Sequence, residues 1–179
     1  MSNNIIPGKK APSLNIETIC GNTWSLDNHL NKSKCMIVFY RGLHCPVCSV
    51  FLKQIESQLL EYKKSNTEVI AVSMDNKEKA LKVKSDWSIK NLNIAYGLSE
   101  ENARKWGLYI SSSNGKTSAG VIEPDLFPEP GLFLVRPDNT LYFASVQTMP
   151  FARPSFSDIL KAVSFVIEKD YPARGEVSS

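Results

Sequence analysis

The pattern of apolar and polar positions near the start of the chain predicts two kinds of β-strand. Residues 14–26 read LNIETICGNTWSL, in which two short alternating segments flank a Cys-Gly-Asn turn, as in a β-hairpin. Residues 35–40 read CMIVFY, an unbroken apolar run of strand length, which is typical of a strand covered on both faces. The chain is therefore expected to begin with a hairpin and to continue into a buried strand.

Helical periodicity begins after this buried strand and then alternates with further strands. Apolar residues at 47, 51, 52, 55, 59 and 62 share one side of a predicted helix of about four turns. Strands are predicted at 67–74 and 93–98. Helices are predicted at 76–89 and 99–107, and Ser99 is the expected N-cap of the second.

No periodicity of either kind is visible between residues 108 and 130. ISSSNGKTSAG is followed there by the proline-rich VIEPDLFPEP. A segment of this length without regular structure is unusual in a compact domain and tends to be functional or mobile. Residues 108–130 are therefore interpreted as a long loop insertion.

The last part of the chain returns to regular patterning. Apolar runs at 131–135 and 140–146 flank a Pro-Asp-Asn turn, which predicts a second hairpin. Ser155, with Asp158 three residues later, is expected to start a final helix. Its apolar positions are 156, 159, 160, 163 and 166, which give the helix one core face.

This order of elements predicts the fold class. Strand–helix–strand crossovers require parallel neighbours in one sheet, and the late hairpin adds antiparallel ones. The expected product is an α/β fold with a mixed central sheet flanked by helices and an extra N-terminal β-hairpin. A chain of 179 residues fits one such domain over residues 1–179 and is long enough to bury a core.

Composition and charge exclude several classes of protein. The hydrophobic fraction of 42% and the charged fraction of 22% disfavour disorder, and no apolar run approaches the roughly 20 residues that span a bilayer. A net charge of +3 with both signs interleaved indicates a solvated surface and no nucleic-acid partner. Because MSNNIIPGKKAP lacks the apolar region of a signal peptide, a cytoplasmic location without a membrane partner is expected.

Two of the four cysteines lie three positions apart, where the buried strand gives way to the first helix. In a reducing compartment such a pair is more often catalytic or metal-binding than part of a disulfide scaffold. Pro46 suits the first helical position, because its missing N–H would be unpaired there anyway. Cys45 is thus expected at or near the N-cap, where free amide donors and the helix dipole stabilise a thiolate.

Cys48 lies one helical turn beyond Cys45, within reach for a disulfide. Thiol–disulfide exchange uses an exposed, acidic sulfur that attacks and a sheltered sulfur that resolves the mixed disulfide. Cys45 and Cys48 are assigned to these roles. Arg41, His44 and Pro46 are candidates for tuning the pair, and His44 has two interpretations, a stabiliser of the thiolate or a side chain that points to water.

Less specific interpretations stay open. The cysteine pair is also compatible with a structural role, or with two ligands of a zinc site whose second ligand pair is not visible. Cys35 and Cys20 are interpreted as core filler and as a surface thiol. Residues 149–154, MPFARP, are interpreted as a helix-entry corner in preference to a lip of the substrate site.

The stretch around the cysteine pair resembles a known family. The YRGxxCPxC pattern is found in the AhpC/TSA, peroxiredoxin-like branch of the thioredoxin-like suprafamily. The matching residues are Tyr40, Arg41, Gly42, Cys45, Pro46 and Cys48. The resemblance covers most of the chain and implies a thioredoxin-like fold. It also implies that Pro130, ahead of GLFLV, lies opposite the cysteines as a cis proline and helps to bind an extended substrate.

One departure from the family pattern separates two functions. Peroxiredoxins proper carry the motif PxxxTxxC or PxxxSxxC. When Cys48 is aligned with the cysteine of this motif, Arg41 stands in place of the proline and Cys45 in place of the threonine or serine. The peroxide pocket is therefore not visible in the sequence. The leading hypothesis is a thiol-disulfide oxidoreductase. The alternative is a thiol-dependent peroxidase that reduces hydrogen peroxide or alkyl hydroperoxides, and the third is a non-catalytic binding module.

Both catalytic hypotheses need the same kinds of partner. The substrate is a protein or small-molecule disulfide in the first and a peroxide in the second. An external thiol reductant supplies the electrons in each. No prosthetic group or metal is required, and the sequence leaves a homodimer open.

Overall fold

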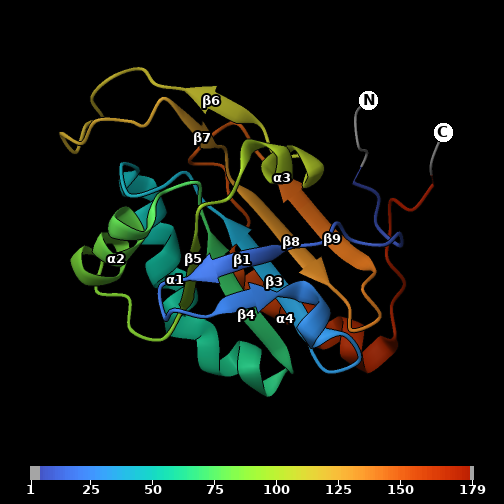
Figure 1. The fold of residues 1–179 in the computed structure, drawn as a ribbon. Coiled ribbons are helices and arrows are strands. Elements are labelled where there is room, and N and C mark those ends of the chain that lie inside the picture. Colours follow the sequence, from blue (N-terminus) through green and yellow to red (C-terminus); the bar gives the residue numbers. More distant parts are fainter. Residues whose placement is uncertain (1–4, 178–179) are drawn as a thin grey trace.

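The computed structural model describes residues 5–177, and Figure 1 shows its elements in chain order. The strands are β1 (Asn15–Thr18), β2 (Thr23–Ser25), β3 (Lys34–Phe39), β4 (Thr67–Val72), β5 (Asn93–Tyr96), β6 (Ile110–Ser112), β7 (Leu126–Pro128), β8 (Gly131–Val135) and β9 (Leu141–Val146). The helices are α1 (Pro46–Lys64), α2 (Lys77–Asp86), α3 (Glu100–Lys105), α4 (Phe156–Lys169) and the short 3-10 helix η1 (Leu26–His29).

Among the described residues, seven strands form one mixed sheet in the order β2-β1-β5-β4-β3-β8-β9. The strands β3, β4 and β5 are parallel, whereas β8 and β9 are antiparallel and β1 joins β5 in the antiparallel sense. The N-terminal hairpin β1–β2 therefore extends the sheet at one edge. The mixed sheet and this hairpin confirm the predicted α/β, thioredoxin-like architecture.

The sheet separates two layers of apolar side chains. The helices α1, α2 and α4 pack on one face, and α3, η1 and the N-terminal hairpin contribute to the other. Strand β3 is buried on both sides, with Met36 and Val38 on the first face and Cys35, Ile37 and Phe39 on the second. This is why its sequence is continuously apolar instead of alternating.

Local side-chain capping explains where three of the helices begin. Asn76, Ser99 and Ser155 each accept a hydrogen bond from the backbone N–H three residues later. The predicted starts at Ser99 and Ser155 are confirmed. The predicted strand at 67–74 and the predicted helix at 76–89 are shorter in the structure, where they end at Val72 and Asp86.

The sequence pattern suggested that residues 108–130 lack regular structure, and the structure shows that this prediction is wrong. Strands β6 and β7 pair in antiparallel register within them, and an isolated bridge joins Lys116 to Ile122. Three-residue strands are too short to show a period-2 pattern, and the pairing connects positions up to 18 residues apart. We call residues 108–130 the insertion hairpin.

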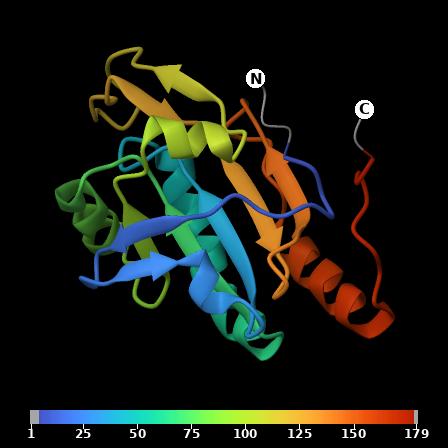
Figure 2. The same cartoon turned by 45° about the vertical axis from the view of Figure 1, so that its right-hand side comes forward.

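The geometry of the sheet sets the place of the candidate site. Because β3 and β4 are parallel neighbours, the loops that follow them meet at the same edge. The first leads into α1 and the second into α2, and the insertion hairpin lies at this edge in both views (Figures 1 and 2). None of the helices described in residues 5–177 combines the length and the apolar character that a membrane crossing needs.

Candidate active site

Cys45 is the N-cap of α1, and Pro46 is the first helical residue, as predicted. The Cys45 backbone is extended, with φ −97° and ψ 105°, and its N–H donates to the Gly42 carbonyl at 3.1 Å. The Cys45 Sγ accepts a hydrogen bond from the Cys48 N–H at 3.3 Å. The sulfur thus takes the place that a serine or aspartate oxygen holds in an ordinary N-cap.

Both sulfurs are free thiols, and both cysteines are buried. Cys48 is sheltered as expected, with 0% exposure, but Cys45 is only 1% exposed, so the expectation of an exposed attacking sulfur is wrong. The sequence placed Cys45 correctly on the helix but did not show what packs above it. Both residues belong to the apolar cluster under α1 and α4.

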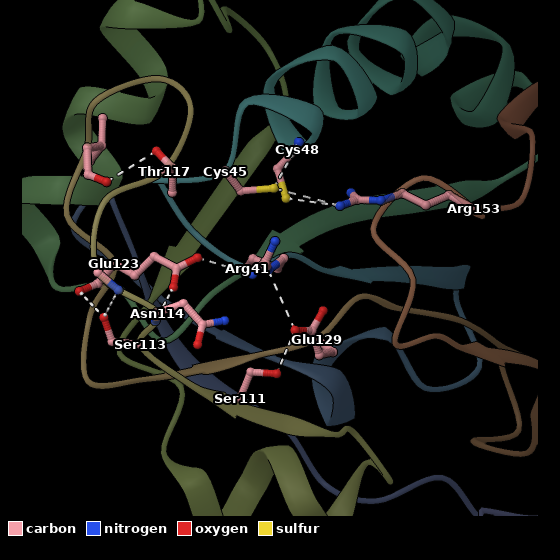
Figure 3. A network of polar contacts seen from close by, with 12 residues as sticks. Arg41, Cys45, Cys48, Ser111, Ser113, Asn114, Thr117, Glu123, Glu129 and Arg153 are labelled. Carbon is pink, nitrogen blue, oxygen red and sulfur yellow. Dashed lines mark hydrogen bonds and ion pairs between the residues drawn. The ribbon is translucent and has the colours of Figure 1, made fainter.

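Arg153, from the segment between β9 and α4, reaches both sulfurs (Figure 3). Its Nη2 lies 3.2 Å from the Cys48 Sγ and 3.9 Å from the Cys45 Sγ. The guanidinium stacks on Phe51 of α1, with Cζ 4.8 Å from the ring centroid, and Nε donates to the Pro150 carbonyl at 2.6 Å. Ring and carbonyl together fix the cation over the cysteine pair.

Sequence reasoning missed this arginine as a site residue. The MPFARP segment does form the corner before α4, as interpreted, but its Arg153 is at the same time a wall of the site. A single arginine in an aperiodic, proline-bounded segment carries no signal of its own. The contact joins positions 105 residues apart, so only the fold reveals it.

The environment separates the acidities of the two thiols. The pKa of Cys45 falls from its ordinary value of 9.0 to about 6, first because the Cys48 side chain hydrogen-bonds to its sulfur. Burial opposes this change, whereas the Cys48 N–H and the charges of Arg153 and Arg41 support it. Burial, and then the neighbouring Cys45, raise the pKa of Cys48 well above its ordinary value. The pair is therefore poised as a Cys45 thiolate beside a protonated Cys48.

This asymmetry predicts the pH dependence of the thiolate. Because a lowered pKa means deprotonation at lower pH, the Cys45 thiolate should form as pH rises through about 6. The ultraviolet absorbance of the thiolate, taken as the difference between the parent protein and Cys45→Ser, should show this midpoint. Cys20→Ser, which removes an exposed thiol elsewhere, should leave the midpoint in place. A midpoint near the ordinary 9.0 would contradict the proposed environment.

Arg41, predicted as a cation near the thiolate, is held by the insertion hairpin (Figure 3). Its Nη2 lies 3.3 Å from the Glu123 carboxylate, and its Nε lies 3.6 Å from that of Glu129. Its Cζ also lies 4.6 Å from the centroid of the Phe127 ring. Arg41 lowers the pKa of Cys45, but Arg153 contributes more.

The two carboxylates are themselves fixed within the insertion hairpin. Glu123 accepts the Asn114 backbone N–H at 2.7 Å, and Glu129 accepts the Ser111 hydroxyl at 2.7 Å. Both side chains are largely buried, with 9% and 7% exposure. The insertion hairpin is thus tied to the strand end that carries Arg41.

We expect this tie to contribute to stability. Glu123→Gln removes a buried negative charge opposite Arg41 and should lower the free energy of unfolding by about 1–3 kcal/mol, measured by urea denaturation. The matched control is Glu78→Gln, which breaks an exposed ion pair with Lys82 and should change stability little. Equal effects of the two substitutions would show that the tie is no stronger than a surface pair.

Neither interpretation of His44 from the sequence holds in the structure. The residue is 2% exposed, so it does not point to water, and its ring lies 4.6 Å from that of Phe127. Burial, and then the charge of Arg41, lower its pKa to about 4. The imidazole is therefore neutral near pH 7 and supplies no positive charge to the thiolate. Its ring instead packs against the insertion hairpin.

Pro130 is placed directly before β8, at the entry of a central strand. The expectation of a cis Glu129–Pro130 bond is wrong, because the described residues contain no cis peptide bond. The Pro130 carbonyl accepts the Gln147 N–H at 3.0 Å, so this oxygen takes part in the pairing of β8 with β9. A substrate-binding role for Pro130 stays a prediction from the resemblance.

The other two cysteines lie outside the site. Cys35 packs in the second apolar layer, and burial raises its pKa to about 12, whereas Cys20 is exposed in the turn between β1 and β2. Within residues 5–177, no three side chains of the His, Cys, Asp and Glu types come together as they would around a metal ion.

Comparisons with known proteins agree with this fold. Residues 7–144 match the model of the AhpC/TSA family. A search of curated proteins finds no match.

Solved peroxiredoxin structures are similar in fold. A mutant of peroxiredoxin 6 from Arenicola marina superposes with a TM-score of 0.72 at 22% identity, covering 93% of this chain and 76% of that one. The reduced 2-Cys peroxiredoxin of Plasmodium vivax gives 0.74 at 15% identity, with 92% and 83% covered. The peroxidoxin BcpB of Mycobacterium tuberculosis gives 0.71 at 13% identity, with 91% and 99% covered. Since the family model spans well over half of its residues, the chain belongs to the AhpC/TSA family.

Proposed function

We propose that this protein is a thiol-dependent peroxidase in which Cys45 attacks the peroxide and Cys48 resolves the product. Membership of the AhpC/TSA family and the peroxiredoxin-like fold support a thiol-dependent redox enzyme. The observation that carries the finer proposal is the burial of an acidic thiol: Cys45 is 1% exposed, and its pKa is lowered to about 6.

Burial favours a small substrate over a protein disulfide. A mixed disulfide forms only when the attacking sulfur reaches a sulfur of another chain, together with the backbone that carries it. Hydrogen peroxide has only two oxygen atoms, and an alkyl hydroperoxide can present its terminal oxygen first, so both need far less open space at the thiolate than a protein disulfide does. The buried Cys45 therefore suits a peroxide better than the disulfide exchange that its CxxC spacing first suggested.

The proposed reaction has two steps inside the protein. The Cys45 thiolate attacks one peroxide oxygen, an S–O bond forms as the O–O bond breaks, and the other oxygen leaves as water or alcohol after taking a proton. Cys48 then attacks the sulfenic sulfur, which forms the Cys45–Cys48 disulfide and releases the hydroxyl as water. Two external thiol groups, which are oxidised together to a disulfide, supply the two electrons that restore the dithiol after each peroxide.

Arg153 is placed to assist the first step. Its Nη2 already contacts the two sulfurs, while its buried Nη1 has no hydrogen-bond partner among the described residues. A peroxide oxygen that develops negative charge would accept this free donor. Such a preorganised cation stabilises the charge that appears as the O–O bond breaks.

A second candidate function, thiol–disulfide exchange, has support from one observation. The pair combines an acidic N-cap thiol with a partner of raised pKa one turn away, which is the asymmetry that this reaction uses. A small disulfide would meet fewer steric limits at the buried Cys45 than a protein would. A cytoplasmic location and a homodimer stay predictions for either function.

The deciding experiment follows hydrogen peroxide consumption by the full chain with dithiothreitol as the electron donor, beside insulin reduction. We expect peroxide consumption and little insulin reduction. In Cys48→Ser protein, dimedone should label Cys45 after one equivalent of peroxide. If dimedone instead labels Cys48 in Cys45→Ser protein and does not label Cys45 in Cys48→Ser protein, Cys48 is the attacking thiol and Cys45 the resolving one. Rapid insulin reduction without peroxide consumption would establish the exchange activity instead.

A further inference from the structure

The turn between β3 and α1 carries Cys45 and has an unusual backbone. Gly42 has φ +131°, a conformation that side-chain-bearing residues rarely adopt. Its carbonyl accepts the Cys45 N–H at 3.1 Å, which closes the turn onto the N-cap. The position of the Cys45 sulfur therefore depends on how this turn is held.

Asp75 holds the turn from the neighbouring loop. It follows the parallel strand β4 and is buried, with 5% exposure. Its Oδ2 accepts the Leu43 N–H at 2.7 Å, two residues before Cys45. The carboxylate also lies directly against Gly42, since a Cβ there would come within 2.8 Å of Oδ2. A glycine is thus required both by its φ and by the approach of this carboxylate.

Asp75 is itself fixed by its backbone. Its N–H donates to the Ser73 hydroxyl at 3.3 Å, and its carbonyl accepts the Gly97 N–H at 2.8 Å, after β5. The adjoining strands are locked as well, because the Tyr40 N–H donates to the Val72 carbonyl at 3.0 Å. The backbone of Asp75 is therefore held near the ends of the parallel strands β3, β4 and β5, and its side chain reaches the Gly42 turn from there.

We propose that Asp75 is the positioning residue of the attacking thiol, acting through the Leu43 N–H and the Gly42 turn to hold Cys45 at the N-cap of α1. Since none of the hydrogen bonds described in residues 5–177 joins Asp75 to either sulfur, we assign it a positioning role and not a catalytic one. The inference rests on the proposed function only in treating Cys45 as the attacking thiol.

The contacts that activate Cys45 depend on this position. The Cys48 N–H lies 3.3 Å from the Cys45 Sγ, and Arg153 Nη2 lies 3.9 Å away, so a small displacement weakens both. If the turn loses its tie to Asp75, the N-cap geometry loosens and the thiolate is less stabilised. The pKa of Cys45 then moves back toward its ordinary value.

The test compares Asp75→Ala with Asp75→Asn. Asparagine keeps an oxygen that accepts the Leu43 N–H, whereas alanine leaves this donor unpaired. The Cys45 thiolate is titrated by its ultraviolet absorbance. Asp75→Ala should shift the midpoint upward by about one pH unit, which is about a tenfold change in the ionisation constant, and Asp75→Asn should restore most of it. Asp86→Ala, which removes an exposed carboxylate at the end of α2, is the matched control and should shift nothing.

Two outcomes would overturn the proposal. One is an unchanged midpoint in a folded Asp75→Ala protein. The other, measured on the parent protein and independent of any variant that fails to fold, is fast hydrogen exchange at the Leu43 amide, which a bond to a buried carboxylate should slow. A parent midpoint near the ordinary thiol value, by contrast, would count against the proposed function, so the two failures are distinguishable.

Discussion

Cys45→Ser should abolish peroxide turnover, with a loss of about 10³-fold or more. A serine hydroxyl at the N-cap accepts the same Cys48 N–H, so the helix start should be preserved. The hydroxyl is not ionised near neutral pH and is a far weaker nucleophile than a thiolate, so the first step should fail. The measurement is the initial rate of hydrogen peroxide consumption with dithiothreitol in excess.

The matched control for this loss is Cys20→Ser, an equal exchange at an exposed thiol outside the site. It should retain the parent rate. A Cys45→Ser protein that still consumes peroxide at more than a few per cent of the parent rate would assign the attack to another thiol. Dimedone labelling would then show whether that thiol is Cys48.

Arg153→Ala should give the second largest effect, a decrease of about 10²-fold in the rate of reaction with peroxide. The substitution removes the Nη1 donor that we propose for the developing oxyanion, and losses of this size follow the removal of one preorganised donor. It also removes a positive charge that lowers the pKa of Cys45, so the thiolate midpoint should rise. Stopped-flow measurement of the first turnover, together with the absorbance titration, separates the two contributions.

Arg136→Ala provides the control for this arginine. Arg136 also stacks on an aromatic ring, with Cζ 4.7 Å from the Tyr142 centroid, and donates to the Tyr171 carbonyl at 2.8 Å. It belongs to the β8–β9 turn and makes no described contact with either sulfur. Its replacement should leave the peroxide rate near that of the parent. If both arginine variants slow the reaction equally, the effect is general charge or stability rather than contact with the reacting atoms.

The site joins four segments that are distant in the sequence. The cysteines belong to the start of α1, Arg153 to the corner before α4, Asp75 to the loop after β4, and Glu123 to the insertion hairpin. The start of α1 contributes the helix cap, and the corner before α4 contributes the positive charge. The loop after β4 holds the backbone of the turn, and the insertion hairpin packs over the edge of the sheet and pairs with Arg41. The predicted effects of substitution differ accordingly in rate, thiolate midpoint and stability.

Features with a local cause could be predicted from the sequence. The β1–β2 hairpin, strand β3 and the starts of α3 and α4 depend on turn residues, apolar runs and caps within a few positions. The same holds for Cys45 at the N-cap, because a proline at the first helical position is a local steric preference. The family resemblance rests on residues of this same stretch.

Features without a local cause could not be predicted. The strands β6 and β7 are too short to show an alternating pattern, and each pairs with the other only because the chain between them folds back. The sequence suggested that His44 either stabilises the thiolate or points to water. Both interpretations are wrong, because the His44 ring packs against Phe127, which lies far away in the sequence. The burial of Cys45 likewise depends on the packing of α1 with α4.

The order of strands and helices, the dithiol and the place of Cys45 at the start of α1 could be read from the amino-acid sequence, because they follow from local periodicity, turn residues and caps. The α/β architecture then followed from that order, since strand–helix–strand crossovers require parallel neighbours. The burial of this thiol, the Arg153 cation beside it and the hydrogen bond from its turn to Asp75 became visible only in the folded chain. Charge and burial act through space, between residues that the chain brings together only when it folds.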